Sequence, residues 1–313
     1  MKRLFALSLI LCIAFLLISC GQPDITTTTT GTNTNSGTTP TTDVEQSIPY
    51  QSALISGKFS KFDLQDTCTS GKGYIEFQGD SVQCTGTGVR VEGTKVTIFE
   101  AGCYTVCGQS NNGQIIVEIN KLEKVHLVLQ GITLRCEDSA PLWVKSADKV
   151  SVTLKEGTVN TFSDGTTFGT SVDAPNATIY AKDSLTFNGT GKLVVLANLH
   201  NGIDCSNDLK FISGTYEITA KNNALKGNDA VAILSAHMTI SAGKDGIKSD
   251  TVGDPQKGVV YIAGGTFIIT TMDDGIQAES ALDLQGGHFT FYCAGKDINP
   301  KGQYHIGDGV TSN

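Results

Sequence analysis

The chain of 313 residues contains 31 acidic and 23 basic side chains, which gives a formal net charge of −8. Domains that bind nucleic acid are usually basic, so this balance argues against that class of partner. The length is enough for one large domain or two small ones.

The N-terminus has the pattern of an export signal. Two basic residues precede an apolar run over residues 4–18, and Cys20 closes the lipobox-like motif Leu17-Ile18-Ser19-Cys20. The run is short for a membrane-spanning helix. We therefore predict a lipoprotein signal peptide over residues 1–19, with lipid attachment at Cys20. The mature protein is then an exported, membrane-anchored lipoprotein at the cell surface or in the periplasm. An ordinary secretory signal or a short membrane anchor is the alternative.

Two regions separate this signal from the rest of the chain. Residues 20–48 are rich in Thr, with Gly, Asn, Ser and Pro, a composition that predicts a disordered tether. Residues 49–120 show short alternating strands between Gly-rich turns. Because this region lacks the repeat that follows, we expect it to be an N-terminal β cap over the first coil.

A repeat organises residues 121–313. Four copies have similar heads, and a degraded fifth follows at 297–299; the four are Asn201–Asp204, Asn223–Lys226, Asp245–Lys248 and Asp274–Gln277. The heads are separated by steps of 22, 22 and 29, and the column Tyr216, Met238, Phe267 and Phe289 by steps of 22, 29 and 22; the long step contains an insertion around Ser249–Lys257. Upstream, the alternating apolar pattern of residues 125–129 recurs at residues 150–154, a step of 25.

This repeat predicts a β-solenoid. A fixed period of 20 to 50 residues indicates a repeat architecture, and each copy holds two or three period-2 strands with no helical spacing. One coil cannot bury its own apolar face, but stacked coils bury a continuous column. The predicted inward ladder is Ile203, Leu225, Ile247, Ile276 and Ile298. The glycines beside the ladder suit tight corners that need unusual backbone angles.

Five stretches together resemble a bacterial family of carbohydrate-binding domains. They are residues 96–104, 125–132, 140–147, 152–164 and 176–180. The resemblance covers roughly residues 81–299, including the Asp-Gly-Ile heads. The family is described as binding cellulose and acidic sugars and as similar in shape to polysaccharide lyases. The resemblance therefore implies an all-β, right-handed parallel β-helix, a polysaccharide partner and calcium.

Stacked acidic positions favour a metal site. Coils of a parallel solenoid lie about 4.8 Å apart, so Asp245 and Asp274 stand within about 5 Å of each other. Opposed like charges destabilise a sheet, whereas calcium uses such oxygens as ligands. The predicted metal set is Asp229, Asp245, Asp250, Asp273 and Asp274. The alternative is an internal Asn/Asp ladder that satisfies backbone groups of the turns, which we favour for Asn201 and Asn223.

The next column contains Asp204, Lys226, Lys248 and Gln277. Calcium beside a lysine is also the combination that catalyses β-elimination. The cation acidifies the proton on the carbon next to the uronate carboxylate, and a neutral lysine removes that proton. Lys226 and Lys248 are the candidate bases of such a lyase. We favour the simpler interpretation, a solvated strand face of alternating charge.

Cysteines give less information. Apart from Cys12 and Cys20 there are seven, and an odd number in an exported protein implies at least one free thiol. Cys68 and Cys84 are a candidate disulfide, and most of the others suit small buried hydrophobic positions.

The sequence therefore predicts a surface lipoprotein that binds cellulose or acidic, pectin-like polysaccharide with the help of calcium and without catalysis. A calcium-dependent lyase of uronate polymers and a structural or adhesive surface protein are the alternatives. Trp143 is the one tryptophan available as a sugar platform, and it is equally compatible with a core position.

Overall fold

The computed structural model describes residues 57–169, 171 and 173–313. The predicted signal peptide, the tether and Cys20 lie outside these residues, so those features stay predictions. All regular elements of the described part are β-strands. Within that part, no helix has the length and apolar character needed to cross a bilayer.

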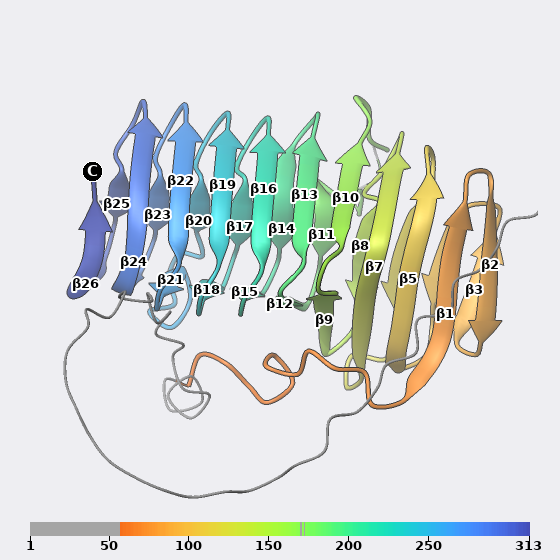
Figure 1. Cartoon of the computed structure of the whole chain (residues 1–313). Helices are drawn as coiled ribbons and strands as arrows, with labels where there is room; N and C mark the ends of the chain where they lie inside the picture. The colour runs from red at the N-terminus through yellow and green to blue at the C-terminus, as the bar shows by residue number, and fades with distance from the viewer. Residues whose placement is uncertain (1–56, 170, 172) are drawn as a thin grey trace, which may run out of the picture. The chain divides into compact units, whose positions relative to one another are not determined.

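The strands form one sheet of 16 strands and one of 10 strands, called sheet A and sheet B here (Figure 1). Sheet A forms two sides of the solenoid, each a row of stacked strands, which we call its first face and its second face. Its first face contains β9 (Lys149–Leu154), β12 (Ser184–Gly189), β15 (Asp208–Phe211), β18 (Ala230–Ile233) and β21 (Val259–Ile262). Its second face contains β10 (Val159–Asp164), β13 (Lys192–Ala197), β16 (Thr215–Ala220), β19 (His237–Ala242) and β22 (Thr266–Thr271).

Two long strands, β7 (Lys124–Cys136) and β24 (Ala281–Cys293), join the two faces of sheet A, because the two halves of each pair with different neighbours. Two further strands, β5 (Gly102–Ser110) and β26 (Gln303–Ser312), pair along β7 and β24, respectively. Sheet B contains β3 (Val89–Glu92), β4 (Lys95–Ile98), β6 (Gln114–Glu118), β8 (Leu142–Ser146), β11 (Ala177–Ala181), β14 (Asn201–Cys205), β17 (Leu225–Gly227), β20 (Ile247–Ser249), β23 (Ile276–Ala278) and β25 (Ile298–Pro300).

The observed register confirms the predicted period. Ile203 pairs with Leu225, Leu225 with Ile247, and Ile247 with Ile276, all in parallel strands. These four side chains are fully buried, and Ile298, which pairs with Ile276, is half-buried. Successive coils thus stack as a parallel β-helix, with an apolar ladder along the inner side of sheet B.

Antiparallel pairing occurs twice among the described strands. β1 (Gly71–Gln78) pairs with β2 (Ser81–Gly86), and β3 pairs with β4. Parallel pairing nevertheless extends to β1 with β5 and to β4 with β6. The stacking therefore runs across the predicted boundary at residue 120.

Aromatic side chains fill the centre of the coils. Phe187 stacks on Phe211 with ring centroids 5.3 Å apart, and Tyr216 packs edge-on against Phe211 at 5.0 Å. Near the C-terminal end, Phe267 stacks on Phe289 at 4.6 Å. Stacking follows from the register, because equivalent residues of successive coils face each other along the core.

Glycine at the repeat heads serves close packing, so the sequence-based explanation by unusual backbone angles was wrong for these positions. Gly202, Gly246 and Gly275 are absent from the glycines with positive φ. A Cβ at each would lie 2.5–2.6 Å from a carbonyl oxygen of the next coil. The coils approach too closely there for any side chain.

The disulfide joins Cys68 to Cys103, so the proposed pairing of Cys68 with Cys84 was wrong. Cys84 belongs to β2 and Cys103 to β5, and these strands lie on opposite sides of β1. The chain enters β1 from the β5 side, which leaves Cys84 a free thiol. Cys107, Cys136 and Cys205 are free and buried, as expected for small hydrophobic positions.

Candidate functional site

One outward-facing column of sheet B combines aromatic, charged and amide side chains. It follows the strand register from β8 to β25 through Trp143, Tyr180, Asp204, Lys226, Lys248, Gln277 and Asn299. Between Trp143 and Lys248 lie four coil-to-coil steps, about 19 Å at roughly 4.8 Å per step. The column is therefore an extended row of polar and aromatic groups along the solenoid axis.

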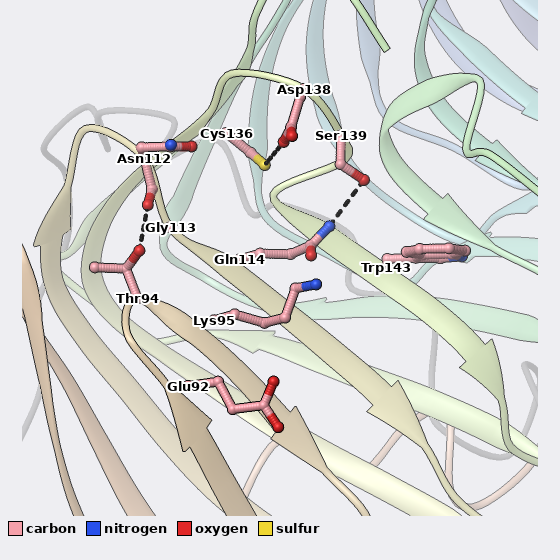
Figure 2. Close-up of a pocket in the computed structure, with 10 residues that line it drawn as sticks. All are labelled: Glu92, Thr94, Lys95, Asn112, Gly113, Gln114, Cys136, Asp138, Ser139 and Trp143. Atoms are coloured by element: carbon pink, nitrogen blue, oxygen red, sulfur yellow. Dashed lines mark hydrogen bonds between the residues drawn. The ribbon is translucent and has the colours of Figure 1, made fainter. Parts of the chain in front are cut away.

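A cavity of about 280 Å³ lies at the aromatic end of this column (Figure 2). Trp143 forms one side of it, and Gln114, Lys95, Glu92 and Asp138 are among the other lining residues. The indole ring is half-buried and faces outward from β8, so Trp143 is a surface residue of the sheet rather than part of the core. The volume is close to the lower end of the range for small-molecule sites, about 300–1,000 Å³.

Two residues that line this cavity, Gln114 and Trp143, make well-defined contacts. The Gln114 side-chain amide donates hydrogen bonds to Ser139 Oγ at 2.9 Å and to the Ala140 carbonyl at 2.8 Å. The Lys145 ammonium lies 4.6 Å from the centroid of the Trp143 ring, a cation–π contact. The Lys145 side chain therefore lies over one face of the indole ring.

Asp204 is the buried acid of the column, with 2% of its surface exposed. Asn201 Nδ2 donates a hydrogen bond to its Oδ2 at 2.7 Å. Burial raises the pKa of Asp204 to about 6, although the nearby Lys226 charge acts in the opposite direction. A carboxyl group with this pKa changes its charge in the mildly acidic range.

Both candidate base lysines are engaged by carboxylates. Lys226 Nζ lies 3.2 Å from Asp250 Oδ2. Lys248 Nζ lies 2.7 Å from Asp245 Oδ2 and donates to Gln277 Oε1 at 3.3 Å. The pair therefore forms part of an ionic network along sheet B.

The polar column at the repeat heads forms a hydrogen-bonded ladder. Asn201 Oδ1 accepts from the Asn223 backbone N–H at 3.1 Å, and Asn223 Oδ1 accepts from the Asp245 N–H at 3.2 Å. Asp245 Oδ1 accepts from the Asp274 N–H at 3.2 Å, and Asp274 Oδ1 from the Lys296 N–H at 2.8 Å. Each side chain thus satisfies a backbone donor of the next coil. Asn201 and Asn223 match the ladder interpretation favoured for them.

The same ladder brings three acidic residues together. Asp245, Asp273 and Asp274 each offer a carboxylate oxygen within 4.8 Å of the others. Asp245 is 1% exposed and Asp274 is 8% exposed, while Asp273 is open to solvent. Carboxylate oxygens suit calcium, which takes six to eight oxygen ligands, so the backbone or water has to supply the remainder. The ammonium of Lys248 neutralises part of the negative charge of this cluster.

The two other predicted metal ligands make ion pairs elsewhere. Asp229 Oδ2 lies 3.0 Å from Lys257 Nζ, and Asp250 forms an ion pair with Lys226. The insertion between β20 and β21 therefore folds back onto the preceding coil through its own charges. The structure brings three of the five predicted ligands into one cluster.

Sequence reasoning missed the cavity next to Trp143. Its lining comes from several successive coils, through Glu92, Lys95, Gln114 and Asp138. These residues belong to the region whose repeat is weakest, so no periodic signal placed them in one column.

The fold and site define a class, a parallel β-helix with an outward polar and aromatic face. A sequence model of the family described as carbohydrate-binding domain-containing protein matches residues 92–312, and the chain belongs to this family. A protein of that description from Acetivibrio thermocellus is 38% identical over 239 residues, covering 75% of this chain and 84% of the relative.

A solved structure is also similar. It is described as the polysaccharide lyase-like protein from C. thermocellum, gadolinium derivative. It aligns with a TM-score of 0.75 and 37% identity, covering 77% of this chain and 99% of the solved one.

Proposed function

We propose that this protein binds a polysaccharide along the outer face of sheet B without cleaving it. The observation that carries the proposal is the outward column that begins at Trp143 and Tyr180 and continues, beyond the buried Asp204, to Lys226 and Lys248. Aromatic rings suit the apolar faces of sugar rings, and the polar groups suit hydroxyl and carboxylate groups. Membership of a carbohydrate-binding domain family supports the same conclusion.

We further propose that calcium assists binding at Asp245, Asp273 and Asp274. Their mutual distance and the exposure of Asp273 support a cation that reaches the cluster from solvent. A calcium ion at this edge is able to bridge these carboxylates and a uronate of the ligand, since it accepts oxygens from both.

We also propose that the domain functions outside the cytoplasm, held to a membrane through a lipid on Cys20. The basic and apolar residues ahead of Cys20 support this anchoring. The antiparallel strands β2 and β3 form the ends of sheets A and B, respectively, and we assign them the role of an N-terminal cap over a right-handed coil.

The test is retention of the full chain, in detergent, on insoluble cellulose and on calcium-gelled polygalacturonate. We expect calcium-dependent retention on at least one matrix, with no unsaturated oligosaccharide in the supernatant. Retention on neither matrix contradicts the proposed function. Release of unsaturated product contradicts the non-catalytic assignment.

Two variants and a control locate the interaction. Trp143→Ala removes the aromatic side of the cavity, and Asp273→Asn removes the exposed carboxylate without touching the ladder. We expect both to weaken retention, with only Asp273→Asn altering its response to calcium. Asp308→Asn, an exposed acid on β26, is the control for loss of one negative charge and should behave like the wild type.

A further inference from the structure

A segment without regular structure crosses the first face of sheet A (Figure 1). We call residues 57–67 the strap. At one end Phe59 packs in a small cluster with Ala232 and Leu234 of the β18 coil. In the middle of the strap, Phe62 packs edge-on against His126 of β7, with ring centroids 6.4 Å apart, and the disulfide at Cys68 follows the C-terminal end of the strap. The strap therefore spans successive coils and is covalently fixed at its C-terminal end.

The surface beneath the middle of the strap is polar. It is formed by outward side chains of β9, β12 and β15, namely Lys149, Ser151, Thr153, Thr186, Asn188 and Lys210. The last five are between 0% and 8% exposed. Outward positions of a solenoid strand normally face water, and burying polar groups is unfavourable unless each finds a partner. This face is therefore built for a polar occupant.

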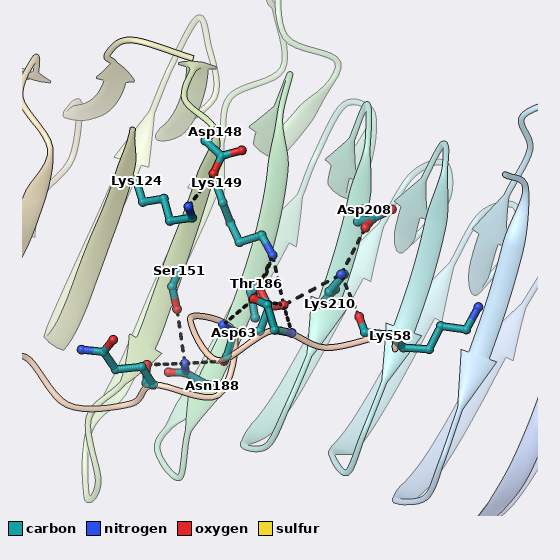
Figure 3. Close-up of polar contacts among 12 residues, drawn as sticks. Lys58, Asp63, Lys124, Asp148, Lys149, Ser151, Thr186, Asn188, Asp208 and Lys210 are labelled. Atoms are coloured by element: carbon teal, nitrogen blue, oxygen red, sulfur yellow. Dashed lines mark hydrogen bonds and ion pairs between the residues drawn. The ribbon is translucent and has the colours of Figure 1, made fainter. Parts of the chain in front are cut away.

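The occupant in this structure is a carboxylate (Figure 3). Asp63 is completely buried and accepts hydrogen bonds from Lys149 Nζ at 2.8 and 3.0 Å and from Thr186 Oγ1 at 2.7 Å. A second ammonium, that of Lys210, lies 3.9 Å from Asp63 Oδ2 and 3.1 Å from Asp208 Oδ2. Burial opposes ionisation of this carboxyl, but the Lys149 and Thr186 hydrogen bonds outweigh it and hold the pKa of Asp63 below its usual value.

The strap backbone satisfies the neighbouring polar groups. Asn188 Nδ2 donates to the carbonyl oxygens of Asp63 at 3.0 Å and Gln65 at 2.8 Å. Lys210 Nζ donates to the carbonyl oxygen of Lys58 at 2.8 Å. A row of carbonyl oxygens around one carboxylate is chemically close to the oxygens of an acidic sugar, which offers hydroxyls and one carboxylate.

We propose that the face under the strap is a second glycan-binding site, specific for acidic sugars, and that Asp63 occupies the position of a ligand carboxylate. The inference rests on the proposed function only in taking the ligand to be a glycan. The Lys149 ammonium selects a carboxylate, because its side chain is only 13% exposed and a neutral sugar would leave its charge without a counter-charge. Lys210 adds positive charge beside it, although Asp208 already balances the Lys210 charge. The hydroxyl and amide groups beside them suit sugar hydroxyls.

Opening of the strap would expose the small apolar cluster around Phe59 but would leave the main core in place. The inward residues of the same strands, such as Val150, Val152, Leu185 and Phe187, are fully buried inside the coil. The polar groups released by an open strap return to water, where they are well solvated. Because the strap competes with the ligand for the same site, only molecules with an open strap bind the ligand. The apparent affinity is therefore the affinity of the open form multiplied by the fraction of molecules in which the strap is open.

The test is calorimetric titration of the full chain with trigalacturonate in EDTA, comparing the wild type with Asp63→Ala. We expect binding to tighten by about tenfold or more, because the variant loses the carboxylate that holds the strap closed. Adding Lys149→Ala to the variant should abolish the gain. Cellotriose, which has no carboxylate, should show no gain in any variant.

Phe59→Ala provides a second route that leaves the Asp63 site intact. It weakens the other end of the strap and should also tighten trigalacturonate binding, which keeps the proposal testable if Asp63→Ala does not fold. Unchanged affinity in the folded variants, or an equal gain for cellotriose, overturns the proposal. EDTA separates this site from the calcium-assisted one, so failure here leaves the retention assay above unaffected, and the reverse also holds.

Discussion

Replacing Asp204 by Asn should stabilise the protein at neutral pH and not at low pH. Burial raises the pKa of Asp204 from its ordinary value of 3.8 to about 6, and the side chain is only 2% exposed. The folded state therefore binds a proton between these two values that the unfolded state does not bind. Stability from this group is fully present below pH 3.8 and is lost as pH rises through 6.

The magnitude follows from the shift. About 2 pKa units at about 1.4 kcal/mol each correspond to a cost of about 3 kcal/mol for ionised Asp204 at pH 8. Asn resembles the protonated acid in shape and carries no charge. We therefore expect Asp204→Asn to raise the free energy of unfolding by up to about 3 kcal/mol at pH 8 and by little at pH 4.

Urea unfolding at both pH values measures this difference. Asp148→Asn is the control, because Asp148 forms an exposed ion pair with Lys124 and such pairs contribute little. The reasoning is refuted if Asp204→Asn changes stability equally at pH 4 and pH 8, or destabilises the protein at pH 8.

Three further predictions concern the solenoid itself. Phe211→Ala should cost about 3–5 kcal/mol in urea unfolding, because the ring is fully buried between Phe187 and Tyr216, whereas truncation of Leu196, 41% exposed, should cost much less. Gly202→Ala should lower the free energy of unfolding by about 1–3 kcal/mol, because the new Cβ would lie 2.6 Å from the Ala224 carbonyl oxygen. Gly169→Ala, with open space around it, should be nearly neutral, and equal Tm values for the two variants would contradict the packing argument. Alkylation of the unfolded, unreduced chain followed by peptide mass spectrometry should label Cys84, Cys107, Cys136, Cys205 and Cys293 and spare Cys68 and Cys103; a labelled Cys68 would contradict the assigned disulfide.

The sequence predicted the repeating part of the fold well. Equivalent residues such as Ile203, Leu225 and Ile247 recur at a fixed step, and strict stacking of coils turns that step directly into strand register. The insertion around residues 249–257 was also visible, because it lengthens one step while the apolar positions on either side keep their order.

The parts that sequence reasoning could not supply depend on contacts without periodicity. The strap has no repeat, so nothing in the sequence indicates that Asp63 pairs with Lys149, 86 residues later in the chain. The cysteine pairing depends on which side of β1 the chain enters, and spacing does not reveal this. Charge spacing likewise placed Asp229 and Asp250 in the metal set, whereas local lysines engage them in the structure.

The acidic cluster shows the same limit at the site. Stacking correctly brought Asp245 close to Asp274, but it did not foresee that each accepts a backbone hydrogen bond from the next coil. A ladder role and a metal role use the same residue types at the same spacing. The exposed Asp273 is therefore the residue that distinguishes them in the retention assay.

Tryptophan fluorescence tests the central claim most directly, because Trp143 is the one tryptophan of the chain and lies in the proposed glycan-binding face. The titrant is a soluble oligosaccharide of whichever polysaccharide matrix retains the protein. Its addition should give a saturable change in the Trp143 emission, at concentrations that also release the protein from that matrix. Unchanged emission at concentrations that release the protein would contradict binding at the outer face of sheet B.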